Sequence, residues 1–252
     1  MRDTTTALAM NANSPDWVVA FPHAPAHTRR MLSRFTLALS LLVLTRTAFA
    51  ADDFAKWEKE IAAFEQHDRE NPPPKNGIVF VGSSSIRLWS TLAEDFPQHR
   101  VLNRGFGGSE IADSVHFADR IVIPYAPRLV VLYAGGNDLN NGKTPERVAA
   151  DFRAFVETVR AKLPDVEIAY ISSAPNPARW AQIENVKALN AANAAFVAAQ
   201  PKLKFINVFP HMLGDDGLPK PDIFRDDRLH MNPEGYKIWT RIIAPLLPPP
   251  DK

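Results

Sequence analysis

Ile78-Val79-Phe80-Val81-Gly82-Ser83-Ser84-Ser85-Ile86 joins a short apolar run to a glycine and three consecutive serines. An apolar run of this length, preceded by the prolines at 72–74 and Gly77, predicts a buried parallel strand. Gly82 permits a sharp turn, because glycine adopts backbone angles that are closed to other residues. The serines therefore lie at the carboxyl end of the predicted strand, where open α/β sheets bind their ligands. A second interpretation stays open here, since serine is also a favoured N-cap residue and these three could simply begin the next helix.

Strands and helices alternate through the rest of the chain, from about residue 77 to residue 245. Strands are predicted at residues 77–81, 100–103, 128–133, 166–171 and 204–208. Helices are predicted at 52–70, at 86–92, at 109–123, from 144 onward, within 176–200, and from 232 to before Pro245. The helix from 144 has an apolar stripe that faces inward, formed by Val148, Phe152, Phe155, Val156 and Val159. This alternation is typical of an α/β fold with a parallel sheet covered on both faces. Right-handed crossovers do not select the strand order uniquely.

Three further segments carry residue types suited to acyl transfer. Asn103-Arg104-Gly105-Phe106-Gly107-Gly108 forms a glycine-rich turn, and Tyr133-Ala134-Gly135-Gly136-Asn137-Asp138 follows an apolar strand. Asp227-Arg228-Leu229-His230-Met231-Asn232-Pro233 lies near the C-terminus. A serine at one strand end, an amide at another and an Asp-x-x-His pair are the components of an acyl-transfer site.

The four segments together resemble the sequence blocks of the SGNH (GDSL-type) hydrolase superfamily, over residues 77 to 245. This resemblance implies a three-layer α/β/α sandwich, flavodoxin-like, with a parallel five-stranded sheet of order 2-1-3-4-5. It also implies an esterase or lysophospholipase-like enzyme that cleaves carboxylic esters without a cofactor. A different class of function stays open, a non-catalytic carbohydrate- or lipid-binding module on the same fold.

The resemblance assigns the catalytic residues. Alignment on Gly82 makes Ser84 the nucleophile, although Ser83 and Ser85 replace the aspartate and leucine of the superfamily block. A serine hydroxyl needs an adjacent base, and His230 fits because a carboxylate precedes it by three residues. Asp227 would orient His230, with Asp226 as the neighbouring competitor. The remaining candidates, His67, His99, His116 and His211, are interpreted as packed or solvated.

The oxyanion of the tetrahedral intermediate needs preorganised donors. The resemblance supplies three: the backbone N–H of Ser84, the backbone N–H of Gly108 and the side-chain amide of Asn137. Simpler interpretations stay open, in which Gly107-Gly108 is an ordinary turn and Asn137-Asp138 caps a helix. Several apolar residues either line an acyl pocket or belong to the core: Trp89, Phe106, Phe224 and Leu229. No long inserted lid is visible in the sequence, which disfavours a long-chain lipase.

Composition excludes several other functions. The 29 basic and 28 acidic residues give a net charge of +1, which offers no electrostatic reason to expect nucleic acid as a partner. The chain has no cysteine, so disulfides and thiolate chemistry are excluded. No His-Glu-x-x-His or P-loop motif occurs, and we expect no metal and no nucleotide cofactor.

The N-terminal part predicts export. Residues 1–30 look disordered, or lie before the true start at Met31. Residues 31–50 read as a secretory signal peptide, with a short apolar run and the cleavage motif Ala48-Phe49-Ala50. An uncleaved anchor and a twin-arginine signal at Arg29-Arg30 are the alternatives. We expect a helix and linker at 51–74, with Trp57 and Phe64 packing on a hydrolase domain at 75–247, in a secreted or periplasmic protein without a stable membrane anchor.

Overall fold

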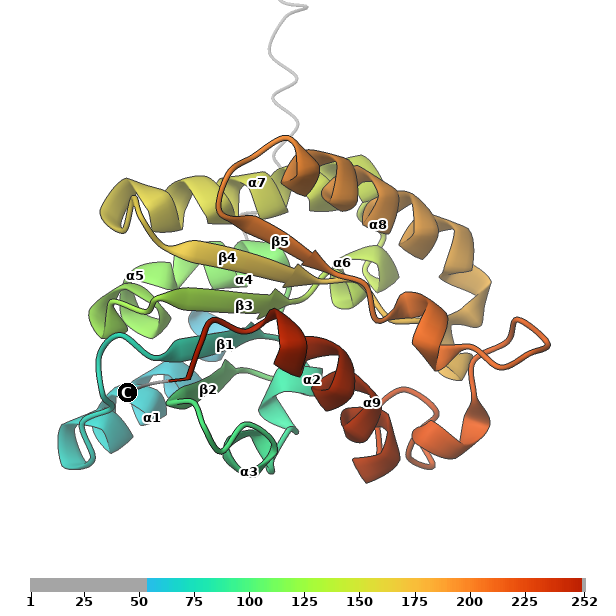
Figure 1. Cartoon of the computed structure of the whole chain (residues 1–252). Coiled ribbons are helices and arrows are strands. Elements are labelled where there is room, and N and C mark those ends of the chain that lie inside the picture. The colour runs from blue at the N-terminus through green and yellow to red at the C-terminus, as the bar shows by residue number, and fades with distance from the viewer. Residues whose placement is uncertain (1–53, 251–252) are drawn as a thin grey trace, which may run out of the picture. The chain divides into compact units, whose positions relative to one another are not determined.

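Five short parallel strands form the centre of the described part of the chain, residues 54–250 of the computed structural model (Figure 1). The strands are β1 (Ile78–Gly82), β2 (Val101–Gly105), β3 (Leu129–Tyr133), β4 (Glu167–Ile171) and β5 (Leu203–Ile206). Their order is β2-β1-β3-β4-β5, and every neighbouring pair is parallel. The predicted fold class and strand order are therefore confirmed.

Helices cover both faces of the sheet, as the apolar strands predicted. One face packs against α1 (Glu58–Glu70), α4 (Ile111–His116), α5 (Ala118–Ile121), α7 (Pro145–Lys162) and α8 (Ile183–Ala198), and α6 (Gly136–Asn140) adds Leu139 to this layer. The other face packs against α2 (Ser84–Arg87), α3 (Leu92–Asp95) and α9 (Pro233–Ile243). The 3-10 turns are η1 (Phe54–Trp57), η2 (Ile123–Tyr125), η3 (Pro177–Gln182), η4 (Phe209–Met212), η5 (Pro221–Ile223) and η6 (Ala244–Leu246).

The two helices with the clearest sequence signals form as predicted. Thr144 caps α7 by accepting the backbone N–H of Arg147, and all five residues of its predicted inner stripe are buried. Asn232 caps α9 by accepting the N–H groups of Glu234 and Gly235. Each helix has proline in its first turn, where no intrahelical N–H is required.

Other element boundaries differ from the prediction. The expected helix at 109–123 is divided at Phe117, which lies between α4 and α5 with its ring buried. The helix expected at 86–92 is only one turn long and ends at Arg87, and Trp89 beyond it is buried in the core. β5 ends at Ile206 rather than at 208, since the N–H of Val208 donates to the Ser172 hydroxyl (3.0 Å).

Some predictions fall on residues that the structure does not describe. The signal peptide at 31–50, the segment at 1–30 and the first two residues of the helix predicted at 52–70 lie outside the described residues. Trp57 and Phe64 lie inside them and pack against the core, as predicted. Among residues 54–250, no helix is long and apolar enough to cross a membrane.

Candidate active site

The turn after β1 holds the candidate nucleophile. Gly82 has a φ of 137°, and a Cβ at this position would lie 1.9 Å from the carbonyl oxygen of Tyr133 on β3. Only glycine fits so close an approach at a positive φ. The N–H of Ser83 donates to that same oxygen (3.0 Å), and the N–H of Phe106 donates to the Gly82 carbonyl (2.9 Å). Both neighbouring strands thus fix the turn that presents Ser84.

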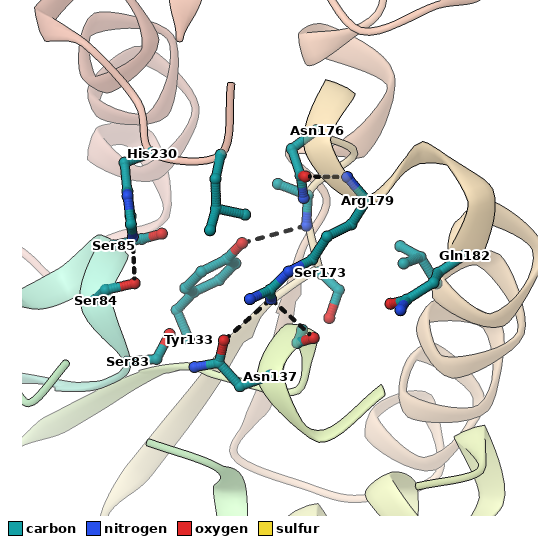
Figure 2. Close-up of a pocket in the computed structure, with 14 residues that line it drawn as sticks. Ser83, Ser84, Ser85, Tyr133, Asn137, Ser173, Asn176, Arg179, Gln182 and His230 are labelled. Atoms are coloured by element: carbon teal, nitrogen blue, oxygen red, sulfur yellow. Dashed lines mark hydrogen bonds between the residues drawn. The ribbon is translucent and has the colours of Figure 1, made fainter. Parts of the chain in front are cut away.

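Ser84 is directed at His230 rather than at the helix backbone (Figure 2). Its Oγ lies 2.9 Å from His230 Nε2. Ser83 occupies the N-cap position of α2, but its side chain makes no capping hydrogen bond. The serines therefore do begin the next helix, as the second interpretation allowed, but Ser83 does not cap it through its side chain.

Asp227 holds the other ring nitrogen of His230, with Oδ2 2.6 Å from Nδ1. Its Oδ1 accepts the backbone N–H groups of Leu229 and His230, each at 2.9 Å. The backbone N–H of Arg225 donates to the His230 carbonyl (2.8 Å), which braces the loop from the other side. The carboxylate that contacts His230 is therefore that of Asp227, the one the Asp-x-x-His spacing selected.

The loop also sets the charge of Asp227. Desolvation raises the pKa of this carboxyl, but the hydrogen bonds from the backbone and ring of His230 and from Leu229 outweigh it. The pKa of Asp227 falls to about 2 as a result. Asp227 is thus a carboxylate at neutral pH, and it can hold the Nδ1–H tautomer of His230.

Asn137, the predicted amide donor, lies near the start of α6. Its Nδ2 donates to the Ser109 carbonyl (2.9 Å), and its Oδ1 accepts from Arg179 Nη1 (3.0 Å). The N-cap of α6 is Gly135, so the interpretation of Asn137-Asp138 as a helix cap is wrong.

The pocket around Ser84 brings most of the predicted site together. Its fourteen lining residues include Ser84, Asn137 and His230. Gly108 is not among them. It lies in the turn after β2 at a φ of 80° and reaches the site through the next residue, since the Ser109 carbonyl holds Asn137.

The apolar residues left open by the sequence divide between pocket and core. Leu229 lines the pocket. Trp89, Phe106 and Phe224 are buried in the two core clusters instead. The pocket wall is otherwise largely polar, with Ser83, Ser85, Ser173, Asn176 and Gln182.

Arg179 is a lining residue that the sequence prediction missed, and Tyr133 is another. Arg179 extends from η3, the turn that follows β4 (Figure 2). The sequence offered one indication of Arg179, its position shortly after the fourth predicted strand. The carboxyl ends of parallel strands meet at one edge of a sheet, so residues that follow them lie near the site. Among residues 54–250, no group of three His, Cys, Asp or Glu side chains could hold a metal ion.

Known proteins resemble this chain over most of the described residues. Residues 80–238 match the model of the GDSL-like Lipase/Acylhydrolase family. Platelet-activating factor acetylhydrolase IB subunit alpha1 from Bos taurus and from Homo sapiens is 27% identical over 183 residues, 68% of this chain and 74% of each relative.

Solved structures share the fold. A GDSL-like lipase from Bacteroides thetaiotaomicron has a TM-score of 0.62 and 22% identity, covering 77% of this chain and 96% of its own. A carbohydrate esterase family 3 protein from Talaromyces cellulolyticus has a TM-score of 0.54 and 18% identity, covering 67% and 94%. At these identities the likeness concerns the fold alone.

Proposed function

Because the chain belongs to the GDSL-like lipase/acylhydrolase family of ester hydrolases, we propose that it cleaves small carboxylic esters through a Ser84–His230–Asp227 triad. One observation carries the proposal: His230 bridges Ser84 Oγ at 2.9 Å and Asp227 Oδ2 at 2.6 Å. Residues far apart in the chain thereby form the nucleophile, base and orienting group of acyl transfer.

The reaction proceeds in two steps. Ser84 Oγ attacks the ester carbonyl carbon while His230 Nε2 takes its proton, and the alcohol leaves with that proton as the acyl-enzyme forms. Water then attacks the acyl carbon, again giving a proton to His230, which returns it to Ser84 as the acid departs. Asp227 stabilises the imidazolium in both steps without being protonated itself.

The oxyanion donors are the N–H groups of Ser84 and Gly108 and the amide of Asn137. The Asn137 Nδ2 group carries two hydrogens, and the Ser109 carbonyl takes one. The second hydrogen is left for the oxyanion. An amide does not titrate, so Asn137 remains a donor at every pH.

The lining of the pocket supports a small acyl group. A long acyl chain needs a continuous apolar wall, whereas here serine, asparagine and glutamine predominate. The curated relatives are named as acetylhydrolase subunits. We therefore place acetyl and similarly short esters first among substrates of this chain.

The proposal includes export. The apolar run at 36–44 and Ala48-Phe49-Ala50 support a secreted or periplasmic enzyme released by cleavage after Ala50. The alternative, a module that only binds carbohydrate or lipid, would have no need of three aligned catalytic side chains.

A panel of p-nitrophenyl esters of increasing acyl length tests the proposal on the mature protein. We expect the acetyl ester to be cleaved fastest, and a serine-reactive organophosphate to block the activity and label Ser84. Ser84→Ala should abolish hydrolysis and labelling while leaving the fold intact, because the truncation removes little packing. Ser83→Ala and Ser85→Ala are the matched controls and should still be labelled. A label on either neighbouring serine would overturn the assignment of Ser84.

A further inference from the structure

Arg179 is a charged side chain that the proposed reaction does not use. It lies between Tyr133 and Asn137, across the pocket from His230 (Figure 2). Its Nη1 donates to the Gly136 carbonyl (3.1 Å) and to Asn137 Oδ1 (3.0 Å). Both acceptors are neutral, so these hydrogen bonds hold the guanidinium in place without compensating its charge.

No acidic side chain offsets this charge in the pocket. None of the fourteen lining residues is Asp or Glu, and no carboxylate among residues 54–250 forms an ion pair with Arg179. Burial lowers the pKa of Arg179, as expected for a cation that is partly desolvated without a counterion. A half-buried charge of this kind is costly unless a partner arrives.

The unused side of the guanidinium has the shape of an anion receptor. Both hydrogens of Nη1 are taken, which leaves Nε and Nη2, and these two atoms have no hydrogen-bond partner among the described residues. Neither atom is sealed from solvent. The Nε–Nη2 edge presents parallel N–H groups that match two oxygens of a carboxylate or a phosphate.

The backbone holds this edge in position. Asn176 Oδ1 accepts the N–H of Arg179 (2.9 Å), and the N–H of Ala178 donates to the carbonyl of Arg228 in the catalytic loop (3.1 Å). The turn that carries Arg179 is therefore tied to the loop that carries His230. A ligand on Arg179 would sit at a fixed place relative to the reacting serine.

We propose that Arg179 binds an anionic group of the substrate, a carboxylate or a phosphate attached close to the scissile ester. The inference rests on the proposed function of the pocket and narrows it, from small esters in general to small esters that carry a negative charge.

Binding without turnover tests the anion site directly. The Ser84→Ala protein is titrated calorimetrically with inorganic phosphate and with malonate at constant ionic strength. We expect both anions to bind, and the added change Arg179→Gln to weaken binding at least about tenfold, the effect of losing charge-assisted hydrogen bonds. Arg153→Gln is the matched control, because Arg153 lies on α7 with its guanidinium over the Phe196 ring.

Turnover with paired esters tests the substrate. Acetate release is measured from acetoxyacetate against its methyl ester, and from 2-acetoxyethyl phosphate against 2-methoxyethyl acetate. We expect the wild-type enzyme to prefer a charged member of at least one pair, and Arg179→Gln to reduce that ratio of kcat/KM by at least about tenfold. The pair that shows the preference distinguishes a carboxylate from a phosphate.

The outcomes separate the two proposals. Equal losses on charged and neutral esters in Arg179→Gln, without anion binding to Ser84→Ala, would mean that Arg179 only positions Asn137, and would overturn the inference. Equal wild-type rates on both members of each pair would overturn it too. Anion binding that depends on Arg179 in a protein that cleaves no ester would instead overturn the proposed function and leave Arg179 as an anion site.

Discussion

Asn137 has a partner at each end of its amide. Ser109 takes a hydrogen of Nδ2, and Arg179 donates to Oδ1, so the amide can neither rotate nor exchange its ends. A donor that is fixed before the reaction costs no reorganisation when the oxyanion forms. Asn137 thus has the rigidity that a donor of an oxyanion hole requires.

Asn137→Ala should therefore lower kcat and kcat/KM by similar factors and leave KM nearly unchanged, because the lost hydrogen bond exists only in the transition state. Removal of one such donor costs roughly a hundred- to thousandfold in rate. Steady-state kinetics on p-nitrophenyl acetate measure the effect. Asn140→Ala, at an exposed position of α6, is the matched control. A raised KM at normal kcat would place Asn137 in ground-state binding instead.

Asp138, the next residue, is a buried carboxyl with an incomplete set of partners. Its Oδ1 accepts the N–H of Ile111 (3.1 Å), while Oδ2 has no partner among the described residues. Desolvation raises its pKa to about 7, although Lys143, 3.7 Å away, acts in the opposite direction. The folded protein therefore holds a proton on Asp138 at pH values where the unfolded chain has lost it.

This difference predicts how stability changes with pH. Between about pH 4 and pH 7 the folded state binds more protons at Asp138 than the unfolded state, so its contribution to the free energy of unfolding falls as pH rises. Asp138→Asn removes the ionisable group and should be more stable than wild type at pH 8, by about 2–4 kcal/mol, and much closer to it at pH 5. Urea unfolding at both pH values measures the difference in free energy of unfolding between the variant and the wild type. Asp119→Asn, at an exposed position, is the control. An equal difference in free energy of unfolding at the two pH values would contradict the prediction.

At the scale of elements, α9 supports the core and the site together. Trp239 and Ile243 are fully buried against the sheet. Tyr236 donates its hydroxyl hydrogen to the carbonyl of Ser85 (2.8 Å), beside the nucleophile. The cap residue Asn232 follows His230 by two positions and also donates to the carbonyls of Asp222 (2.7 Å) and Phe224 (3.2 Å).

Asn232→Ala should consequently affect both stability and rate. Loss of the cap costs about 1 kcal/mol, and loss of the two further hydrogen bonds adds to it. Thr144→Ala removes the cap of α7 at a residue that does not line the pocket, and it is the matched control. We expect both variants to unfold at lower urea, and only Asn232→Ala to lose kcat. Equal kcat in the two variants would show that the cap of α9 does not position His230.

Elements with strong local signals were predictable from the sequence. α7 and α9 begin at an N-cap residue followed by proline, and β1 and β3 are continuous apolar runs. The element boundaries that differ from the prediction depend on tertiary contacts that no local pattern encodes. At Val208, for example, the backbone N–H donates to the side chain of Ser172, the residue after β4, and not to a neighbouring strand.

At the scale of the whole molecule, the site is assembled from the carboxyl ends of β1, β3 and β4 and from the loop before α9 (Figure 1). Ser84, Asp227 and His230 could be located from the sequence because each lies in a short motif with fixed spacing. Arg179 could not, since its path into the pocket depends on the 3-10 turn η3 and on a hydrogen bond to the catalytic loop.

Processing is a prediction about the full chain. The apolar run at 36–44 and Ala48-Phe49-Ala50 favour cleavage by signal peptidase, which requires small residues before the cut. N-terminal sequencing of the exported protein should begin at Ala51. A stable exported form that retains residues 31–50 would favour an anchor in place of a cleaved signal.

His230 follows Ser84 by 146 positions, so during synthesis Ser84 leaves the ribosome long before its hydrogen-bond partner His230. Every strand of the sheet also precedes α9, whose side chains Trp239 and Ile243 complete one core cluster. A ribosome that stops before the last elements therefore releases a chain that lacks His230 and the side chains that complete this core cluster. If the proposed triad is correct, we expect a prematurely terminated chain to lack esterase activity.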